Sequence, residues 1–336
     1  MATDTAEAHE GATIEVDRDF VDHDSSYGTD NQSELTSLSS SVTAYTFENG
    51  RRYHAYKAGK YYGPNDEQEM DREDMKHHWA KLILDGKLHL APIGESPGKI
   101  LDLGTGTGIW CVEMGDLYPS ATIIGTDLSK IQPSWVPPNV SFEIDDFDDD
   151  WTYGDGTFDL IHNRFNSTAV SDWPALSRKC FDALVPGGFI ELVDLTNPPQ
   201  TDDDTMPKAS QLGKFFEVLT DGCAKVGRDV HMPRKWRPTL QEAGFTNIEE
   251  RVFKVPIGGW PKDRKMKEAG VFEMETLREG LPAIGMGFFT RVLQWKPEEV
   301  QVFFAKVRHE LDDKGIHVWL PMHVMWAQKP PEATTS

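Results

Sequence analysis

The feature that most constrains this chain is the glycine-rich stretch ILDLGTGTGIW at residues 100–110. Three glycines, Gly104, Gly106 and Gly108, separate a short apolar run from a run with the pattern of a helix. Glycine allows the backbone to turn tightly after a strand and to approach a bound ligand closely. We therefore predict a strand, a ligand-binding loop and a helix in that order.

The spacing of these glycines excludes two common nucleotide-binding loops. A dinucleotide fingerprint reads G-x-G-x-x-G, but the residue three positions after Gly106 is Ile109. A P-loop reads G-x-x-x-x-G-K-[ST], and no lysine follows the last glycine. What remains is an acid, Asp102, followed by glycine at every second position from 104 to 108.

The segments around the loop alternate between the patterns of strands and helices. Strands that alternate with helices indicate βαβ units and a parallel, doubly wound α/β sheet. The expected strands are 99–104, 121–129, 140–147, 157–165 and 189–195, and the expected helices are 105–119 and 173–188.

Further elements are expected on both sides of this core. Met75, Trp79 and Leu82 lie on one face of a predicted helix that stops at Gly86. Further predictions are a helix at 209–226, a helix and strand at 238–258, a mainly helical stretch at 262–308 with breaks near Pro282 and Pro297, and a final strand at 317–330.

We divide the chain into a series of segments on this basis. Residues 1–44 carry ten acids and one base without a sustained apolar period, which predicts disorder; ordering over the active site is the alternative. The other segments are an N-terminal helical cap or lid at 45–95, a ligand-binding core at 96–200, a helical cap at 201–235, a core helix and strand at 236–260, a helical substrate cap at 261–314 and an antiparallel core strand at 315–330.

The amino-acid composition limits the binding partners and the cell compartment that we expect for this protein. The 34 basic and 55 acidic residues give a net charge of −21, which disfavours binding to nucleic acid or to anionic lipid. No run of 18 apolar residues predicts a membrane span, and the first residues lack the pattern of a secretory signal. Cys111, Cys180 and Cys223 have neither disulfide nor metal-site spacing. We expect a cytoplasmic protein without a metal centre.

The pattern from Asp102 to Gly108 resembles the first motif of class I S-adenosylmethionine-dependent methyltransferases. The resemblance implies a Rossmann-like, doubly wound seven-stranded sheet with N-terminal and C-terminal cap insertions. The implied cofactor, S-adenosylmethionine, has no phosphate to neutralise. Asp102 would support the loop or the cofactor's ammonium group. The residues that would lie against the cofactor are Gly104, Thr105, Gly106 and Gly108.

Acids at the ends of the next strands agree with this cofactor. Asp127 ends the second strand 25 positions after Asp102, where an acid accepts hydrogen bonds from two ribose hydroxyls. By the same resemblance, Asp145 or Asp146 would accept from the adenine amino group. An ordinary surface position is the alternative for Asp127. The other expected cofactor contacts are Leu128, Phe147 and Asn163.

The segments 51–93, 102–110, 125–147 and 312–330 narrow the resemblance to the fungal LaeA-like methyltransferases. That family includes regulators of secondary metabolism and enzymes that methylate fungal metabolites, with O-methylation in indole-alkaloid pathways of the roquefortine–meleagrin type among them. The resemblance implies O-methylation of a hydroxyl or N-hydroxyl on an aromatic or alkaloid small molecule. The alternatives are a regulator in a nuclear protein complex and a cofactor-binding relative without methyl transfer.

A hydroxyl nucleophile benefits from a general base, which the sequence must then supply. Ligands bind at the carboxyl ends of parallel strands, where an antiparallel last strand begins. His317 begins that strand, and the ordinary histidine pKa of about 6.5 suits a base. His162, at the end of the fourth strand, is the second candidate. A reaction without a base, and a structural role for each histidine, are the alternatives.

Aromatic residues in the two caps are the remaining candidates. Tyr53, Tyr56 and Tyr61 would contact the cofactor from the lid, or else pack the cap. Arg164 would hold a carboxylate or pair with the abundant acids. A large apolar substrate cavity would be lined by Trp173, Trp260, Phe272, Met286 and Phe289, for which core packing is the alternative.

Overall fold

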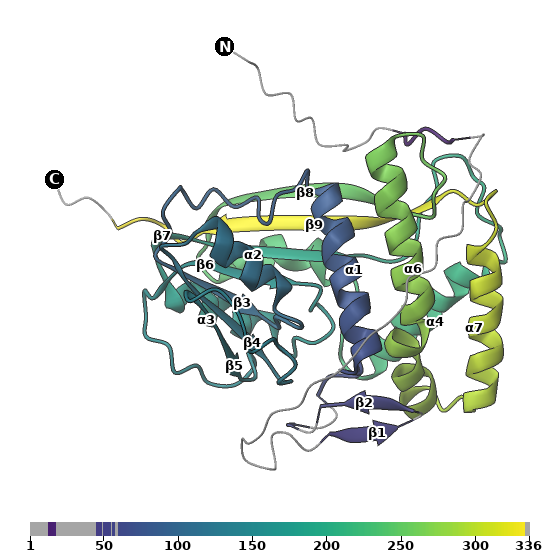
Figure 1. The fold of residues 1–336 in the computed structure, drawn as a ribbon, viewed down its shortest axis with the longest axis horizontal. Coiled ribbons are helices and arrows are strands. Elements are labelled where there is room, and N and C mark those ends of the chain that lie inside the picture. The colour runs from purple at the N-terminus through teal and green to yellow at the C-terminus, as the bar shows by residue number, and fades with distance from the viewer. Residues whose placement is uncertain (1–12, 18–44, 49, 55, 58–59, 333–336) are drawn as a thin grey trace.

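A seven-stranded sheet forms the centre of the protein in the computed structural model, which describes residues 13–17, 45–48, 50–54, 56–57 and 60–332 (Figure 1). The strands follow the order β5-β4-β3-β6-β7-β9-β8. They are β3 (Lys99–Leu103), β4 (Thr122–Asp127), β5 (Val140–Ile144), β6 (Phe158–Arg164), β7 (Leu184–Leu195), β8 (Thr246–Ile257) and β9 (Val318–Gln328).

The sheet is parallel except at β9, which pairs antiparallel with both β7 and β8. Strands buried on both faces read as continuous apolar runs, and Ile100 and Leu101 of β3 are fully buried. This strand order is typical of the Rossmann-like fold of class I methyltransferases, so the predicted fold class is confirmed.

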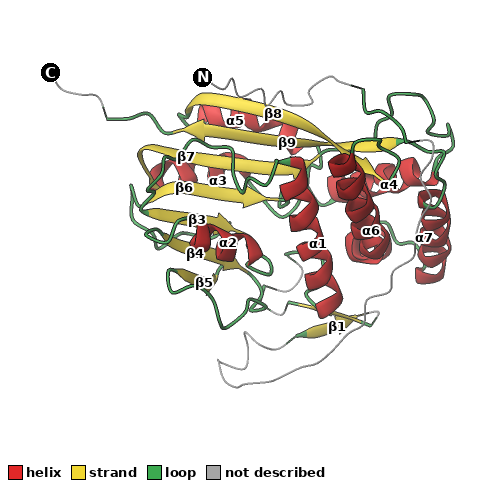
Figure 2. Cartoon of the chain, turned by 45° about the horizontal axis from the view of Figure 1, so that its top comes forward, coloured by secondary structure: helices red, strands yellow, loops and turns green. Residues whose placement is uncertain are grey.

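Helices flank the sheet and also gather at one end of it. Figure 2 shows α1, α4, α6 and α7 side by side at that end, and α1 packs against α6. A small hairpin of β1 (Thr46–Glu48) and β2 (Arg51–Tyr53) precedes them. The helices are α1 (Glu67–Ile83), α2 (Ile109–Leu117), α3 (Trp173–Ala183), α4 (Gln211–Lys225), α5 (Trp236–Glu242), α6 (Arg264–Gly287) and α7 (Pro297–Leu311), with a 3-10 turn at Met232–Lys235 and a π-helical turn at Phe288–Val292.

The predicted break at Pro282 is absent, because α6 continues through this residue to Gly287. Proline removes one backbone hydrogen bond from a helix interior and usually bends or ends the helix. Here Leu277, Leu281 and Met286 are buried on both sides of the proline in the core of the helical cap. Tertiary packing of an apolar face outweighs local propensity, so the helix persists. The break predicted at Pro297 is found, where α7 begins.

Three apolar clusters hold these layers together. One lies between the sheet and α1 and α2, and a second lies on the opposite face under α3 and α5. The third is the core of the helical cap, built around Phe215, Phe289 and Phe304. The cap therefore has a core of its own, to which Ile257 of β8 and Val318 and Leu320 of β9 also contribute.

Part of the N-terminal stretch that was predicted to be disordered is ordered. Val16 forms an antiparallel β-bridge with Pro261, and the Asp17 N–H donates to the carbonyl of Trp260 at 2.6 Å. Backbone pairing fixes residues 13–17, and Ile14 packs against the apolar cluster between the sheet and α1. The rest of residues 1–44 lies outside the described residues. None of the helices in the described part of the chain is long and apolar enough to span a membrane.

Candidate active site

The glycine loop adopts a backbone that other residues disfavour. Gly104, Gly106 and Gly108 have φ values of 69°, 58° and 80°. A Cβ atom at Gly108 would lie 2.4 Å from the Phe142 ring, and one at Gly104 would lie 2.6 Å from the Asn166 amide nitrogen. A Cβ at Gly106 would meet no atom within 4 Å, because this residue faces a cavity. The left-handed φ explains all three glycines, and close neighbours add a second reason at Gly104 and Gly108.

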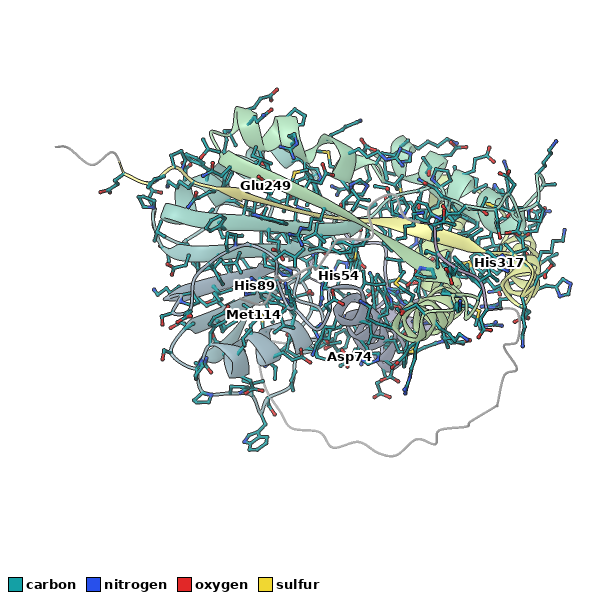
Figure 3. The ribbon with its side chains drawn as sticks, turned by 90° about the horizontal axis from the view of Figure 1, so that it is seen from above. His54, Asp74, His89, Met114, Glu249 and His317 are labelled. Carbon is teal, nitrogen blue, oxygen red and sulfur yellow. The ribbon has the colours of Figure 1, made fainter. Side chains whose placement is uncertain are left out.

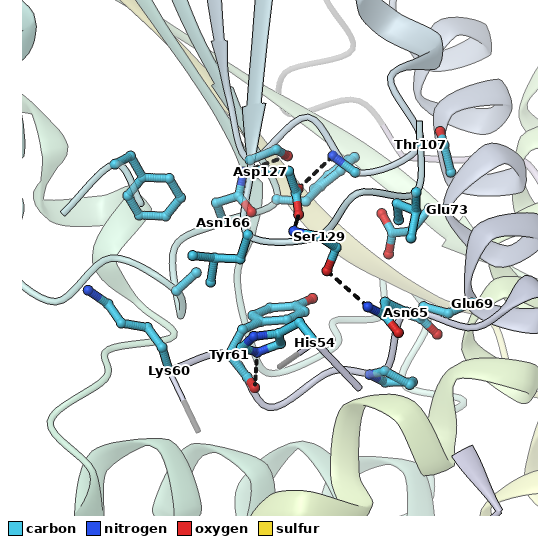
Figure 4. A pocket seen from close by; sticks show the side chains of 18 of the residues that line it. His54, Lys60, Tyr61, Asn65, Glu69, Glu73, Thr107, Asp127, Ser129 and Asn166 are labelled. Carbon is cyan, nitrogen blue, oxygen red and sulfur yellow. Dashed lines mark hydrogen bonds between the residues drawn. The ribbon is translucent and has the colours of Figure 1, made fainter. Parts of the chain in front are cut away.

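A cavity of about 100 Å³ opens at the carboxyl ends of the strands, over this loop. Figure 4 shows Asp127, Ser129 and Asn166 on the side of the sheet, with His54 and Tyr61 facing them from the segment that covers the cavity. The structure brings together in its lining Tyr61, Gly104, Gly106, Asp127, Leu128, Asp145, Asp146 and Phe147 from the predicted cofactor residues.

Asp127 is held by the loop itself. Its Oδ2 atom accepts the Gly106 N–H at 2.9 Å, and its Oδ1 atom accepts the Ser129 N–H at 2.8 Å. Burial raises the pKa of Asp127 to about 6, although these two hydrogen bonds act in the opposite direction. Each carboxylate oxygen has a second lone pair, so the pair of oxygens can accept two further hydroxyl groups.

Asp146 closes the other end of the cavity and is 2% exposed. Lys60 Nζ lies 2.7 Å and Lys57 Nζ 3.1 Å from its Oδ2 atom. Burial alone would raise the pKa of Asp146, but hydrogen bonds from Lys60, the Asp148 backbone and Lys57 lower it overall. Both lysines belong to the segment that covers the cavity, so ion pairs join this segment to the strand ends.

Opposite charges line the part of the cavity near the glycine loop. Glu73 comes from α1 and Arg164 from the end of β6. Arg164 Nη2 donates to His77 Nδ1 at 2.8 Å. Burial, together with the Arg164 charge, lowers the pKa of His77 to about 3, so this histidine stays neutral. The arrangement offers a cation and an anion to a ligand that carries both charges.

Sequence reasoning missed the charged face of α1. Glu69, Arg72, Glu73 and Lys76 follow one another at intervals of three, one and three residues, which places them on one side of a helix. Glu69 and Arg72 are buried there, and Arg72 donates to Glu69 at 3.0 and 2.5 Å. A charged stripe beside an apolar stripe on the same helix was the available signal.

A second cavity, of about 190 Å³, adjoins the first. Tyr61, Glu69 and Phe165 line both cavities and form the boundary between them. The walls of the second cavity are mainly apolar and come from α4, α6, the π-helical turn and β9. They include Phe216, Leu219, Leu277, Ile284, Phe288 and Leu320.

Several predicted residues lie behind the loop and outside these two cavities. His162 Nδ1 donates to Asp102 Oδ1 at 2.7 Å, and its ring stacks on Trp110 at 3.9 Å. This histidine is 1% exposed and lines neither of the two cavities, because it pairs with Asp102 between β6 and β3. The other predicted residues outside the two linings are Thr105 and Asn163, which hydrogen-bond to backbone, Gly108, and Tyr53, whose ring lies under Arg291.

His317 also lies outside both cavities (Figure 3). Its Nδ1 atom donates to Asp203 Oδ2 at 2.6 Å, and its ring lies 5.4 Å from that of Trp260. The last residue of β7, Leu195, pairs with Met322 of β9. His317 is five residues further back, roughly 17 Å along an extended strand. The last strand does begin beyond the carboxyl edge, but it begins too far beyond it to reach the cavities.

The predicted apolar substrate residues lie elsewhere as well. The structure places Trp173 on Trp236 under the sheet, Phe272 against His78, and Met286 and Phe289 in the core of the cap; Trp260 lies beside His317. None of the five lines either cavity. The second cavity instead receives Glu273, Thr276 and Leu277, three positions on one face of α6. The sequence does not show which face of that helix turns inward.

Known proteins resemble this chain along most of its length. A family model described as a methyltransferase domain matches residues 73–250. Methyltransferase pytC of Aspergillus terreus is 44% identical over 318 residues, which cover 94% of this chain and 96% of that protein. The secondary metabolism regulator LAE1 of Cochliobolus heterostrophus is 38% identical, with 85% and 95% covered. The protein-methionine methyltransferase laeA of Emericella nidulans is 32% identical, with 90% and 81% covered.

The fold, the cavity over the glycine loop and these similarities define an S-adenosylmethionine-dependent methyltransferase. The family model covers more than half of the chain, and each of these relatives is more than 30% identical over most of it. The chain belongs to the methyltransferase-domain family that includes pytC and the LaeA-type proteins.

Proposed function

We propose that the protein methylates a small-molecule secondary metabolite, at a hydroxyl or N-hydroxyl group of an aromatic or alkaloid scaffold. The observation that carries this proposal is the second cavity, which is mainly apolar and adjoins the cofactor cavity. A concave, mainly apolar cavity with a few polar side chains suits an organic molecule, since small-molecule sites typically combine these features. The similarity to pytC, which is named a methyltransferase, supports the methyl transfer in this proposal.

In this proposal the first cavity holds S-adenosylmethionine. Asp127 accepts the ribose hydroxyls, and Asp146 or its neighbour Asp145 accepts from the adenine amino group. Gly104 and Gly106 allow close approach of the amino acid part, whose carboxylate and ammonium groups match the charges of Arg164 and Glu73. The positions of these groups around one cavity support the assignment.

The chemistry requires alignment more than acid or base groups on the protein. The cofactor supplies a methyl group activated by its sulfonium. The protein orients the acceptor and excludes water, which removes much of the entropic cost of bringing two reactants together. Tyr61, Glu69 and Phe165 line both cavities, so the two ligands would meet beside these side chains.

A labelling experiment tests this function. Purified protein is incubated with methyl-labelled S-adenosylmethionine and a metabolite extract of the organism that produces it. We expect the label to appear in a small molecule, and an Asp127→Ala control to lose it because the cofactor no longer binds well. Label confined to protein would contradict the proposal.

A regulatory function is the second candidate, because relatives at 38% and 32% identity are named a secondary metabolism regulator and a protein-methionine methyltransferase. In that case the protein would act in a nuclear protein complex. Deletion of the gene separates the two functions. Loss of one methylated product with accumulation of its precursor supports the metabolite enzyme, whereas loss of many unrelated metabolites supports the regulator.

A further inference from the structure

A buried carboxyl group without a hydrogen-bonding partner lies in the second cavity. Glu273 belongs to α6, is 4% exposed and lines this cavity. Among the residues that the structure describes, none forms a hydrogen bond or a salt bridge with its carboxyl group. Burial of a polar group is costly unless a hydrogen bond replaces the lost water. Such a group at a cavity wall points to a bound ligand.

The charged groups around Glu273 are engaged with one another. Arg72 of α1 donates to Glu69 and Glu73, and Lys76 Nζ lies 3.6 Å from Glu73. The same ammonium lies 4.2 Å from the centre of the Phe165 ring. These contacts engage both cations, and among the described residues no hydrogen bond or salt bridge joins either of them to Glu273.

Asp194 at the end of β7 is the other acid that lines this cavity without a cation bonded to it. Its carboxylate accepts the N–H groups of Ser167 and Leu195, at 2.8 and 2.7 Å. Asp194 is therefore satisfied by backbone, in contrast to Glu273.

Glu273 can act as donor or acceptor near neutral pH. Burial raises its pKa to about 8, although Lys76 and Arg72 act in the opposite direction and Glu73 adds to the effect. The neutral acid offers one O–H donor and an acceptor oxygen, and the ionised form offers two acceptor oxygens.

We propose that the Glu273 carboxyl group accepts a hydrogen bond from an N–H or O–H group of the methyl acceptor. The inference rests on the proposed function, in which the second cavity takes the acceptor. The apolar side chains of Leu277, Ile284 and Phe288 would cover the rest of that molecule. The substrate class is then an apolar molecule that presents one hydrogen-bond donor, a hydroxyl or an amine, toward α6 and α1.

Binding of three naphthalene probes to the full-length protein tests this inference without methyl transfer. The probes are 2-naphthylmethanol, 2-naphthylmethylamine and 2-ethylnaphthalene, which share a ring system and differ in the group that meets Glu273. Dissociation constants are measured by naphthalene fluorescence, with S-adenosylhomocysteine present. We expect the alcohol, the amine or both to bind at least tenfold more tightly than 2-ethylnaphthalene. The tighter-binding probe of the alcohol and the amine identifies whether the site prefers a hydroxyl or an amine donor.

Substitution of Glu273 supplies the decisive comparison. In Glu273→Met, which keeps the side-chain length, the preference should vanish while the affinity for 2-ethylnaphthalene changes less than about twofold. Glu279→Gln, which removes an exposed charge from the same helix, should keep the wild-type preference. Unchanged melting temperature and affinity for S-adenosylhomocysteine show that the variants are folded.

The inference is wrong if wild type and Glu273→Met prefer the donor-bearing probes over 2-ethylnaphthalene to the same extent. It is also wrong if the wild type shows no such preference or binds none of the probes. These results leave the labelling of a metabolite untouched. Conversely, the donor-bearing probes could bind preferentially while the methyl label appears only in protein. That result would contradict the proposed function and leave the binding role of Glu273 intact.

Discussion

Asp127 shows how one partly buried carboxyl group makes binding of the cofactor depend on pH. Its two oxygens already accept the N–H groups of Gly106 and Ser129, and burial raises its pKa to about 6. The ribose hydroxyls that we assign to it are donors and therefore favour the ionised carboxylate. The bound state thus has the lower pKa, so affinity is complete above pH 6 and falls as the pH is lowered through that value.

We expect the dissociation constant for S-adenosylhomocysteine, measured by calorimetry, to rise by up to tenfold per pH unit below about pH 6. At pH 7.5, Asp127→Ala should weaken binding more than tenfold, since it removes hydrogen bonds to a charged group worth about 1.5–3 kcal/mol. Asp127→Asn should bind weakly with a flat pH profile. An Asn variant with the wild-type profile would assign the titration to another group.

In contrast to Asp127, His317 is expected to contribute little to the reaction, because of its position. The side chain pairs with Asp203 and lines neither of the two cavities. His317→Ala should therefore change the turnover of the labelled metabolite by less than about twofold. A general base contributes roughly 10²–10⁴-fold, so a loss of that size would return His317 to the active site.

At the scale of elements, the glycine loop joins strand, ligand and helix. Gly108 is the N-cap of α2 and has a φ of 80°, and a Cβ there would overlap the Phe142 ring of β5. Gly156 has a φ of 62°, but a Cβ there would meet no atom within 4 Å. A side chain would be disfavoured by the backbone conformation at both glycines, but it would clash with a neighbour only at Gly108.

We expect Gly156→Ala to cost about 1–2 kcal/mol of folding free energy, because a left-handed backbone disfavours alanine. Gly108→Ala should cost more by about 1–3 kcal/mol, the typical cost of overpacking. Denaturant unfolding of both variants and the wild type measures the difference. Equal costs would show that Phe142 moves aside freely and that the packing of the loop is loose.

The order of elements was predictable from local patterns, but their ends and faces were not. Apolar runs before Gly104 and at residues 189–195 identified β3 and β7. The overhang of β9 beyond Leu195 depends on pairing with β8, a strand distant in sequence, so the position of His317 was not predictable. The face of α6 that carries Glu273 depends in the same way on packing against α1.

At the scale of the whole molecule, the net charge of −21 is unevenly distributed. Residues 1–44 contribute −9, from ten acids and one base, and residues 141–160 contribute eight acids and no base. Part of the second group surrounds the cofactor cavity, where Lys57 and Lys60 meet Asp146. The acidity thus belongs largely to a terminal segment and to one end of a binding site.

This distribution predicts no affinity for nucleic acid through charge. We expect fluorescence anisotropy with a labelled 20-base-pair duplex to show a dissociation constant above about 10⁻⁴ M at 150 mM salt, the weak limit of non-specific DNA binding. Salt-sensitive binding in the micromolar range would reveal a basic surface that the composition conceals.

The central claim is that cofactor and acceptor occupy two adjoining cavities. Ile284 is partly buried in the wall of the second cavity and does not line the first. Ile284→Trp adds a large side chain where the acceptor would sit. The most direct measurement is therefore the kcat/KM of this variant for the metabolite labelled by the wild type, beside its affinity for S-adenosylhomocysteine. We predict a loss of at least tenfold in kcat/KM with cofactor affinity within twofold; undiminished methylation would contradict the claim.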